Sequence, residues 1–343
     1  MIKAGVIGLG CIGKELVRQI TARHWHVSFA ADSRYIYRIH ERFTDDELVK
    51  RAVAPISSYE QFLPGINVLF LAIPSDQGEQ ALHYAYAALK KGIPVITCEK
   101  GLLSEYFSDI RFWFEKNRIG YSATVGGGTM MLPEMQKRLI MHSSPPAIYS
   151  VLNSTLNFLL SGGTVAHAMK LGLLEPGAIG PTAIINAEIA DTVRKAIIIH
   201  NSVLNSAQPI RTKEIKVTPV TPPAYYRLIT GGFRYYVVFS PERQPKIVEG
   251  RNNYICFCES IGNGSIVGGF FKPEKNEFFQ KLAIPGENNA FILDSPYEEY
   301  REIFPAPQGG PGAGPTPTAT AMLKDAEYIL AERGWGCLVS YLP

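Results

Sequence analysis

The sequence predicts a two-domain α/β protein, in which a doubly wound parallel sheet is joined to an α+β domain with a mostly antiparallel sheet. The 343 residues, 46% of them apolar, are enough for about two domains. Up to residue 128, short apolar runs alternate with helical segments, as in a parallel sheet. Later apolar runs are separated by glycine turns such as 262–264, which favour antiparallel strands. We expect a first domain over 1–128, joined by 309–343, and a second over 129–308.

The first domain divides into strands and helices by apolar pattern. A helix is predicted over 76–91, where apolar residues recur at the helical period and Gly92 follows as a stop. The segment 34–60 is more polar and predicts helix and loop. Strands are predicted over 4–8, 26–31, 66–73, 94–97 and 120–124.

The second domain combines strands with two long helices. Helices are predicted over 133–141, 157–171 and 182–204, and a further helix over 316–331 follows the glycine cluster of 309–314. The stretch 305–317, rich in proline and glycine, is expected to be an ordered loop. Strands are predicted over 148–152, 215–220, 235–240, 254–259, 265–271 and 289–293.

The composition excludes several classes of partner. The net charge of +3 is spread along the chain without a basic block, so neither nucleic acid nor a membrane surface is expected as a partner. No apolar run approaches the roughly 20 residues of a spanning helix, and no signal peptide is evident. Five cysteines without C-x-x-C spacing argue against disulfides and a zinc site. We therefore expect a cytoplasmic protein.

The most informative motif is G-x-G-x-x-G at Gly8, Gly10 and Gly13, between an apolar strand and a helical stretch. In a Rossmann-type domain the first glycine makes the tight turn, the second admits the pyrophosphate and the third lets the helix pack closely. Cys11 and Ile12, inside the motif, would place backbone N–H groups at the phosphate. The first domain is therefore predicted to bind a dinucleotide.

Further residues are candidates for contact with this cofactor. Asp32 ends the second strand, about 20 residues past the glycines, where a carboxylate takes the ribose hydroxyls of NAD. Arg34 lies two residues further on and could meet the 2′-phosphate of NADP, so the choice between NAD and NADP stays open. The other candidates are Ser33, Ile73, Pro74, Ser75, Lys100, Gly312 and Gly314.

Three charged side chains are candidates for the chemistry. Asp191 and Lys195 are four residues apart on an apolar helical segment, so they share a helix face. A surface ion pair would have the same spacing, but the isoleucines around this pair leave little of the helix for solvent, and a buried lysine needs a carboxylate to keep its proton. Lys100 closes the strand over 94–97, at the sheet edge where ligands of doubly wound folds bind.

Ordered blocks along nearly the whole chain resemble the homoserine dehydrogenase family. The glycine motif is one block, and Val95-Ile96-Thr97-Cys98-Glu99-Lys100 is similar to the family's V-V-T-A-N-K. The remaining blocks are 123–128, 151–158, Glu175-Pro176, 191–195, 285–290 and 310–314. The resemblance implies reversible hydride transfer between a nicotinamide cofactor, NAD or NADP, and a small amino-acid substrate, aspartate 4-semialdehyde or homoserine.

The resemblance also implies roles for particular residues. Lys195 and Lys100 would be the proton-handling and substrate-orienting lysines, and Asp191 would hold Lys195. Glu175 would bind the amino group of the substrate. Asn153 and Thr155 would also contact the substrate, and the backbone of Val125, Gly127 and Thr129 would hold a monovalent cation. The second domain would be the catalytic and dimerisation domain of a homodimer.

Several positions depart from the family pattern. Gly177 replaces the aspartate of the family's E-P-D-P, Ser154 replaces the glycine of N-G-T, and Asn186 stands where an acid precedes Asp191 by five residues. Ser122 replaces the glutamate common near the cation. Two alternatives therefore stay open: a divergent dehydrogenase of another hydroxy amino acid or hydroxy acid, and a catalytically silent nucleotide-binding sensor.

Overall fold

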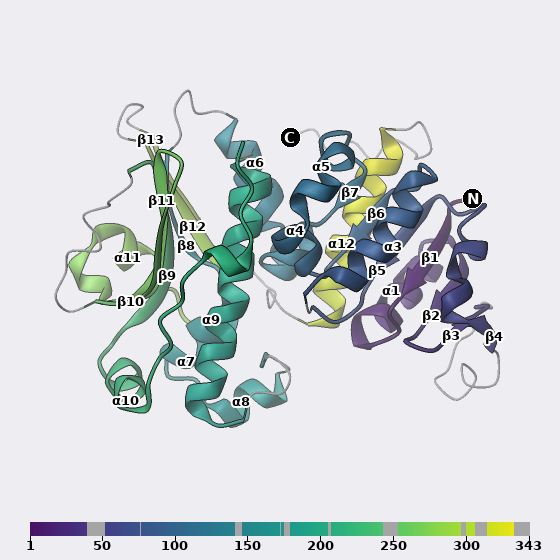
Figure 1. Cartoon of the computed structure of the whole chain (residues 1–343). Coiled ribbons are helices and arrows are strands. Elements are labelled where there is room, and N and C mark those ends of the chain that lie inside the picture. Colours follow the sequence, from purple (N-terminus) through teal and green to yellow (C-terminus); the bar gives the residue numbers. More distant parts are fainter. Residues whose placement is uncertain are drawn as a thin grey trace. The chain divides into compact units, whose positions relative to one another are not determined.

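The computed structural model describes residues 1–39, 52–75, 77–140, 146–171, 173–174, 179–204, 207–242, 253–295, 300–305 and 314–332. The chain forms two compact units (Figure 1). Unit 1 consists of Met1–Gly128 with Pro315–Pro343, and unit 2 of Thr129–Gly314. One sheet is mostly parallel and the other antiparallel, which confirms the predicted fold class.

The sheet of unit 1 has the strand order β4-β3-β2-β1-β5-β6-β7. The neighbouring strands β2, β1, β5, β6 and β7 are parallel. β3 pairs antiparallel with β2, and the edge strand β4 pairs antiparallel with β3. The chain order reverses at β1, which lies between β2 and β5, and this is the switch point where ligands of such sheets bind. The bounds are β1 Lys3–Ile7, β2 His26–Ala31, β3 Tyr35–Tyr37, β4 Ala52–Pro55, β5 Val68–Leu71, β6 Val95–Thr97 and β7 Ile119–Gly120.

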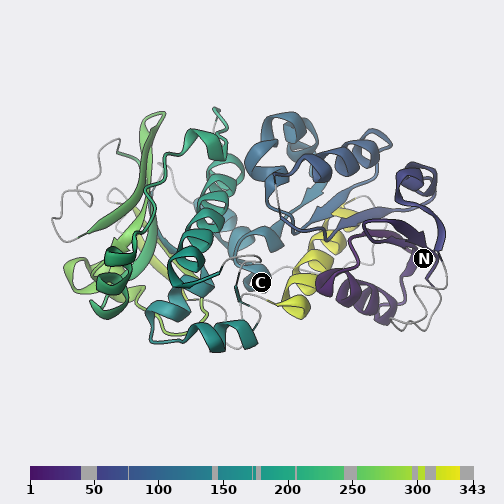
Figure 2. The same ribbon diagram turned by 60° about the horizontal axis from the view of Figure 1, so that its bottom comes forward.

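Helices from both ends of unit 1 pack on this sheet. They are α1 Cys11–Ala22, α3 Glu79–Lys90, α4 Gly101–Glu105, α5 Phe107–Glu115 and α12 Pro315–Ala331. Figure 2 shows α12, in yellow, beside α1, in purple. Thr320 Oγ1 donates to Gln19 Oε1 at 3.1 Å, and Arg23 Nε lies 3.0 Å from Glu327 Oε1. The predicted helix over 316–331 is therefore confirmed and belongs to unit 1.

Two predictions for unit 1 are wrong. The segment 34–60, predicted as helix and loop, contains β3 and β4 followed by the 3-10 turn Ile56–Phe62; residues 40–51 lie outside the described part. The Asp32 carboxylate accepts backbone N–H groups just after β2 and so turns the chain back into an antiparallel hairpin. The strand predicted over 120–124 ends at Gly120, because Ser122 is bonded to Asp325 of α12.

The sheet of unit 2 has the order β10-β11-β9-β8-β12-β13, and every neighbouring pair is antiparallel. Gly262 and Asn263 form the turn between β10 and β11, where Ile261 pairs with Gly264. The bounds are β8 Ala147–Val151, β9 Arg234–Ser240, β10 Tyr254–Ile261, β11 Gly264–Phe271, β12 Ala290–Ser295 and β13 Tyr300–Pro305.

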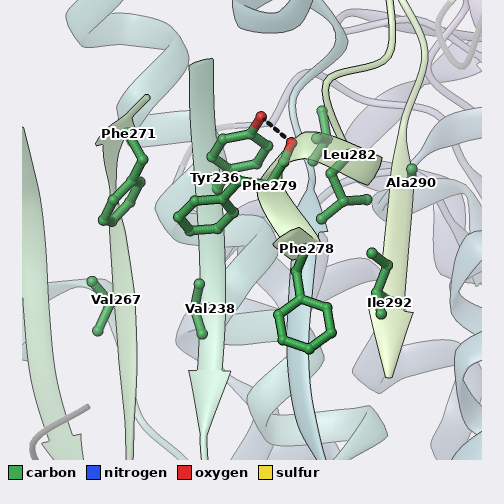
Figure 3. Packing of buried hydrophobic residues seen from close by; sticks show 10 residues of the cluster. Tyr236, Val238, Val267, Phe271, Phe278, Phe279, Leu282, Ala290 and Ile292 are labelled. Carbon is green, nitrogen blue, oxygen red and sulfur yellow. Dashed lines mark hydrogen bonds between the residues drawn. The ribbon is translucent and has the colours of Figure 1, made fainter. Parts of the chain in front are cut away.

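One face of this sheet is covered by the short helix α11, Glu277–Lys281 (Figure 3). The rings of Tyr236 and Phe279 stack with centroids 4.2 Å apart, and the Tyr236 hydroxyl donates to the Phe279 carbonyl at 2.9 Å. A buried aromatic pair of this kind contributes about 1 kcal/mol beyond its buried area. The aromatic residues of α11 therefore anchor the helix to β9.

Besides α11, the described part of unit 2 contains the helices α6 Met131–Leu139, α7 Ser154–Leu160, α8 Val165–Lys170, α9 Pro181–Ile198 and α10 Pro222–Thr230. Helix α9 continues into the π-helical turn Ile199–Val203 and confirms the helix predicted over 182–204. The single helix predicted over 157–171 is wrong. Gly162 has φ +96° and ends α7, and Thr164 Oγ1 caps α8 by accepting from His167 N at 3.2 Å.

The strand predicted over 215–220 is also absent from the described residues. This segment has no ladder partner; instead Thr218 N donates to Cys256 O at 2.7 Å, and Val220 bonds the side chain of Asn186. The ordered loop predicted over 305–317 falls mostly outside the described part. Within the described residues, no helix has the length and apolar character needed to cross a membrane.

Candidate functional site

The three motif glycines of unit 1 serve different purposes. Gly8 has φ +100°, and a Cβ there would lie 2.4 Å from Ala72 O. A Cβ at Gly13 would lie 1.7 Å from Gly8 O, so α1 packs directly on the turn. A Cβ at Gly10 would meet nothing within 4 Å. Packing therefore requires glycine at the first and third positions, whereas Gly10 leaves open space above its backbone.

That open space lies at the N-terminus of α1. The helix begins at Cys11 with Gly10 as N-cap, no side chain caps it, and its first turn has no acidic residue. Backbone N–H groups and the helix dipole there attract phosphate. Cys11 is exposed and Ile12 is half-buried. The open backbone at this helix N-terminus therefore suits a phosphate group.

Asp32 is held firmly at the end of β2. Its Oδ1 accepts the N–H groups of Arg34 and Tyr35, each at 2.7 Å, and its Oδ2 accepts the Tyr37 hydroxyl at 2.7 Å. Burial opposes ionisation of this carboxyl, but the three hydrogen bonds outweigh it and lower its pKa. Burial together with the bond to Asp32 raises the pKa of Tyr37 to about 12. Asp32 is thus a fixed anion, and its neighbours Ser33 and Arg34 are exposed.

Lys100 lies at the carboxyl end of β6, close to the loop that follows β5. Its backbone N–H donates to Ser75 Oγ at 3.2 Å. The preceding side chain, the fully buried Glu99, accepts the N–H groups of Gly101 and Leu102 at 2.6 and 2.7 Å and thereby fixes the start of α4. The structure therefore brings Ser75 and Lys100, two predicted cofactor contacts, to one edge of the sheet. Ile73 is half-buried and Pro74 is exposed in the same loop.

Binding of a monovalent cation by the backbone of Val125, Gly127 and Thr129 stays a prediction. Val125 is buried, Gly127 has φ +53°, and the buried Thr129 hydroxyl has no hydrogen-bond partner. The described residues contain no group of histidine, cysteine, aspartate or glutamate side chains that could hold a metal. At the other end of the chain Gly314 has φ +112°, and Gly312 lies outside the described residues.

Ser122, the position that departs from the family's glutamate, is bound to α12. Its N–H and hydroxyl donate to the Asp325 carboxylate at 2.8 and 2.6 Å. The Asp325 side chain is half-buried, and its partial removal from solvent raises its pKa to about 6 against the effect of these hydrogen bonds. This contact ties α12 to the turn after β7.

The charged candidates of unit 2 form an ion pair on α9. Lys195 Nζ lies 2.7 Å from Asp191 Oδ2, and the two side chains are 14% and 2% exposed. The hydrophobic environment expected from the sequence is present, because Ile184, Ile185 and Ile189 are buried on the same helix. A lysine that retains some exposure while its carboxylate partner is buried can present its ammonium to a ligand.

Asn153 joins this pair from the N-terminus of α7. Its Oδ1 caps the helix by accepting Leu156 N–H at 2.7 Å. Its Nδ2 lies 3.2 Å from Asp191 Oδ2 and 3.0 Å from Glu188 Oε2. The structure therefore brings together three predicted residues, Asn153, Asp191 and Lys195, and adds Glu188.

The two other predicted substrate contacts, Thr155 and Glu175, do not join this group in the described structure. The Thr155 hydroxyl donates to the Leu173 carbonyl at 2.5 Å and is buried, so its hydrogen bond lies within unit 2. Glu175 lies outside the described residues. Asn186, the departure from the family pattern, exchanges two hydrogen bonds with the backbone of Val220, at 2.8 and 3.0 Å.

Sequence reasoning missed three residues that shape these groups: Tyr37, Glu188 and Asp325. Glu188 lies three residues before Asp191, so helical spacing alone places it beside that carboxylate. The tyrosine in β3 had a weaker signal, its position five residues after Asp32. No local pattern relates Ser122 to Asp325, which is 203 residues away.

Solved structures of homoserine dehydrogenases share this fold over nearly the whole chain. The Thermoplasma acidophilum enzyme is 18% identical, with a TM-score of 0.71, covering 96% of this chain and 99% of that one. A hyperthermophilic archaeal homoserine dehydrogenase in complex with NADPH is 18% identical, with a TM-score of 0.61, and covers 96% and 98%.

The Staphylococcus aureus homoserine dehydrogenase at pH 7.5 is 17% identical, with a TM-score of 0.60, and the match covers all of this chain and 78% of that one. No protein-family model and no curated protein matches the sequence. At these identities the comparison establishes the fold of homoserine dehydrogenases for this chain.

Proposed function

We propose that the protein is an NAD(P)-dependent dehydrogenase that interconverts aspartate 4-semialdehyde and homoserine. The observation that carries this proposal is the ion pair between Lys195 and the buried Asp191, at 2.7 Å, in a chain with the fold of homoserine dehydrogenases. The glycine loop of unit 1 supports the cofactor, because Gly10 leaves its backbone open at the N-terminus of α1.

The proposed roles follow from the charge that the reaction creates. When bound, the nicotinamide supplies the hydride for aldehyde reduction and takes it up in the reverse direction. Negative charge develops on the aldehyde oxygen, and the Lys195 ammonium stabilises it and donates the proton that completes the alcohol. Asp191 holds the ammonium in one place. Lys100, at the edge of the other sheet, is proposed as the second lysine of the reaction.

A second candidate is a dehydrogenase of a different hydroxy amino acid or hydroxy acid. Asn186 favours it, since both polar ends of this amide bond the backbone of Val220 where the family has an acid. A panel of homoserine, related hydroxy amino acids and hydroxy acids, oxidised while nicotinamide absorbance is followed, separates the two candidates. If homoserine is not oxidised and another compound is, the second candidate becomes the preferred function.

Replacement of Lys195 tests the catalytic assignment. Lys195→Met removes the ammonium but keeps the length of the side chain, and we expect kcat to fall by about 10² to 10⁴. Lys170→Met on α8, an exposed position, is the matched control and should keep wild-type kcat. Unchanged turnover in Lys195→Met would refute the assignment.

Cofactor binding can be measured without turnover. Cys11 is exposed in the glycine loop, and Cys98 and Cys256 are buried. In a Cys258→Ser, Cys337→Ser background, NADH or NADPH should therefore protect Cys11 from N-ethylmaleimide. Equal labelling with and without both dinucleotides would contradict the proposed cofactor site. We also propose a homodimer, which light scattering after gel filtration measures.

A further inference from the structure

Glu188 is a buried carboxylate in the middle of α9 to which the reaction just described assigns no role. The residue is 2% exposed and lies three positions before Asp191. Its Oε2 accepts a hydrogen bond from Asn153 Nδ2 at 3.0 Å. Burying a carboxylate costs free energy unless it is hydrogen-bonded, so its presence beside a proposed catalytic pair calls for a functional account.

Helical geometry puts Glu188, rather than Asn186, on the side of the proposed catalytic pair. At about 100° per residue, Glu188 is about 60° from Asp191 around the helix axis, and Asn186 is about 140° away. The contacts agree with these angles, since Asn186 bonds Val220 and Glu188 bonds the same amide as Asp191.

Asn153 links the two carboxylates in a fixed orientation. Its Oδ1 accepts the Leu156 N–H, so its Nδ2 must face α9. There Nδ2 lies 3.0 Å from Glu188 Oε2, 3.2 Å from Asp191 Oδ2 and 3.2 Å from the Glu188 carbonyl. The same Asp191 oxygen that bonds this amide also bonds Lys195 at 2.7 Å.

We propose that Glu188 is a positioning residue, which fixes Asn153 and through it the Asp191 carboxylate that holds Lys195. This inference rests on the proposed function of the same site. Glu188 touches neither substrate nor cofactor in this account. It sets the direction in which the ammonium is presented, and a misplacement of about 1 Å at such a group can cost about 10² in rate.

Two substitutions separate the hydrogen bond from the charge. Glu188→Leu removes the acceptor, and we expect kcat to fall about tenfold or more, with KM within about threefold. Glu188→Gln keeps an oxygen for Asn153 and should recover most of that loss. Asn201→Ala, which loses two hydrogen bonds between a buried amide and the backbone of Ile210, is the matched control: it should lower the melting temperature and leave kcat unchanged.

A second measurement reads the contact without turnover. In protein labelled with ¹⁵N-asparagine, the side-chain amide signal of Asn153, assigned by its loss in Asn153→Ala, should shift in Glu188→Leu and stay near its wild-type position in Glu188→Gln. An unmoved signal in Glu188→Leu, a kcat within threefold of wild type, or equal losses in both variants would overturn the inference. Wild-type protein that turns over none of the substrates refutes the proposed function instead, and the amide signal still decides the role of Glu188.

Discussion

The half-buried Asp325 carboxyl should make the stability of unit 1 fall as the pH rises from 4 to 7. Burial raises its pKa from the ordinary 3.8 to about 6. The folded protein therefore keeps the proton at pH values where the unfolded chain has lost it, and the folded state is favoured less as the pH increases. At about 1.4 kcal/mol per pKa unit, the free energy of unfolding is lowered by about 3 kcal/mol once the pH is above 6.

Asp325→Asn removes this titration and keeps the local contacts. The asparagine oxygen can accept the Ser122 N–H, and its NH₂ can donate to the Ser122 hydroxyl, in place of the two bonds seen now. The pKa of Asp325 is 3.8 in the unfolded chain and about 6 in the folded protein. Its titration therefore lowers the free energy of unfolding of the wild type by about 0.6 kcal/mol at pH 4 and by about 3 kcal/mol at pH 7. The variant should therefore gain about 2 kcal/mol over the wild type between these two pH values.

Tryptophan fluorescence during urea unfolding is the assay. Trp25 and Trp113 lie in unit 1, and a Trp335→Phe background leaves these two as the only tryptophans, so the signal then reports on this unit. Glu60→Gln, an exposed carboxyl of the same unit, is the control and should show no such trend. A difference between Asp325→Asn and wild type that is constant from pH 4 to pH 7 would refute the reasoning.

Three further predictions concern Asp32 and the glycine loop. Because Asp32 is a fixed anion, the wild type should prefer NADH to NADPH. Asp32→Ser should reduce that preference about 30-fold, because it removes a repulsion of about 2 kcal/mol between the carboxylate and the 2′-phosphate. Steady-state kinetics with both cofactors measures the preference, and a wild-type preference for NADPH would contradict the prediction. Gly10→Val should fold normally but weaken NADH binding about tenfold or more, measured by fluorescence titration, because its side chain enters the space left for the pyrophosphate. Gly13→Val should lower the melting temperature, since its Cβ would collide with Gly8 O; a normal melting temperature would show that α1 can shift.

The fold class and most elements could be predicted because they depend on local patterns. The helix over 182–204 has continuous apolar residues, and the glycine motif requires a strand before it and a helix after it. The antiparallel pairing of β2 with β3 escaped prediction because the Asp32 side chain turns the chain after β2, and a polar sequence gives little sign of such a turn. The strand predicted over 215–220 is wrong for the opposite reason: its apolar alternation is real, but its backbone bonds the side chains of Asn186, Tyr254 and Glu259 and a single carbonyl, that of Cys256.

The candidate site could be predicted where its residues share one helix. Asp191 and Lys195 are four residues apart, and the structure pairs them. Glu188 has the same kind of spacing and could have been found by examining every charged residue on that face. Asn153 was predicted from the resemblance alone, since its contact with α9 joins residues 35 and 38 positions apart. Contacts between distant segments depend on tertiary packing, which no local pattern encodes.

The return of α12 to unit 1 has a consequence for the order of folding during synthesis. Unit 2 is one continuous segment, so all its strands have been translated before α12 appears. Unit 1 lacks the partner of α1 and of Ser122 until residues 315–331 have left the ribosome. Domains generally fold as units as they emerge, so the N-terminal part waits for the C-terminal helix while unit 2 completes its fold. The glycine loop, although made first, becomes part of a finished unit last.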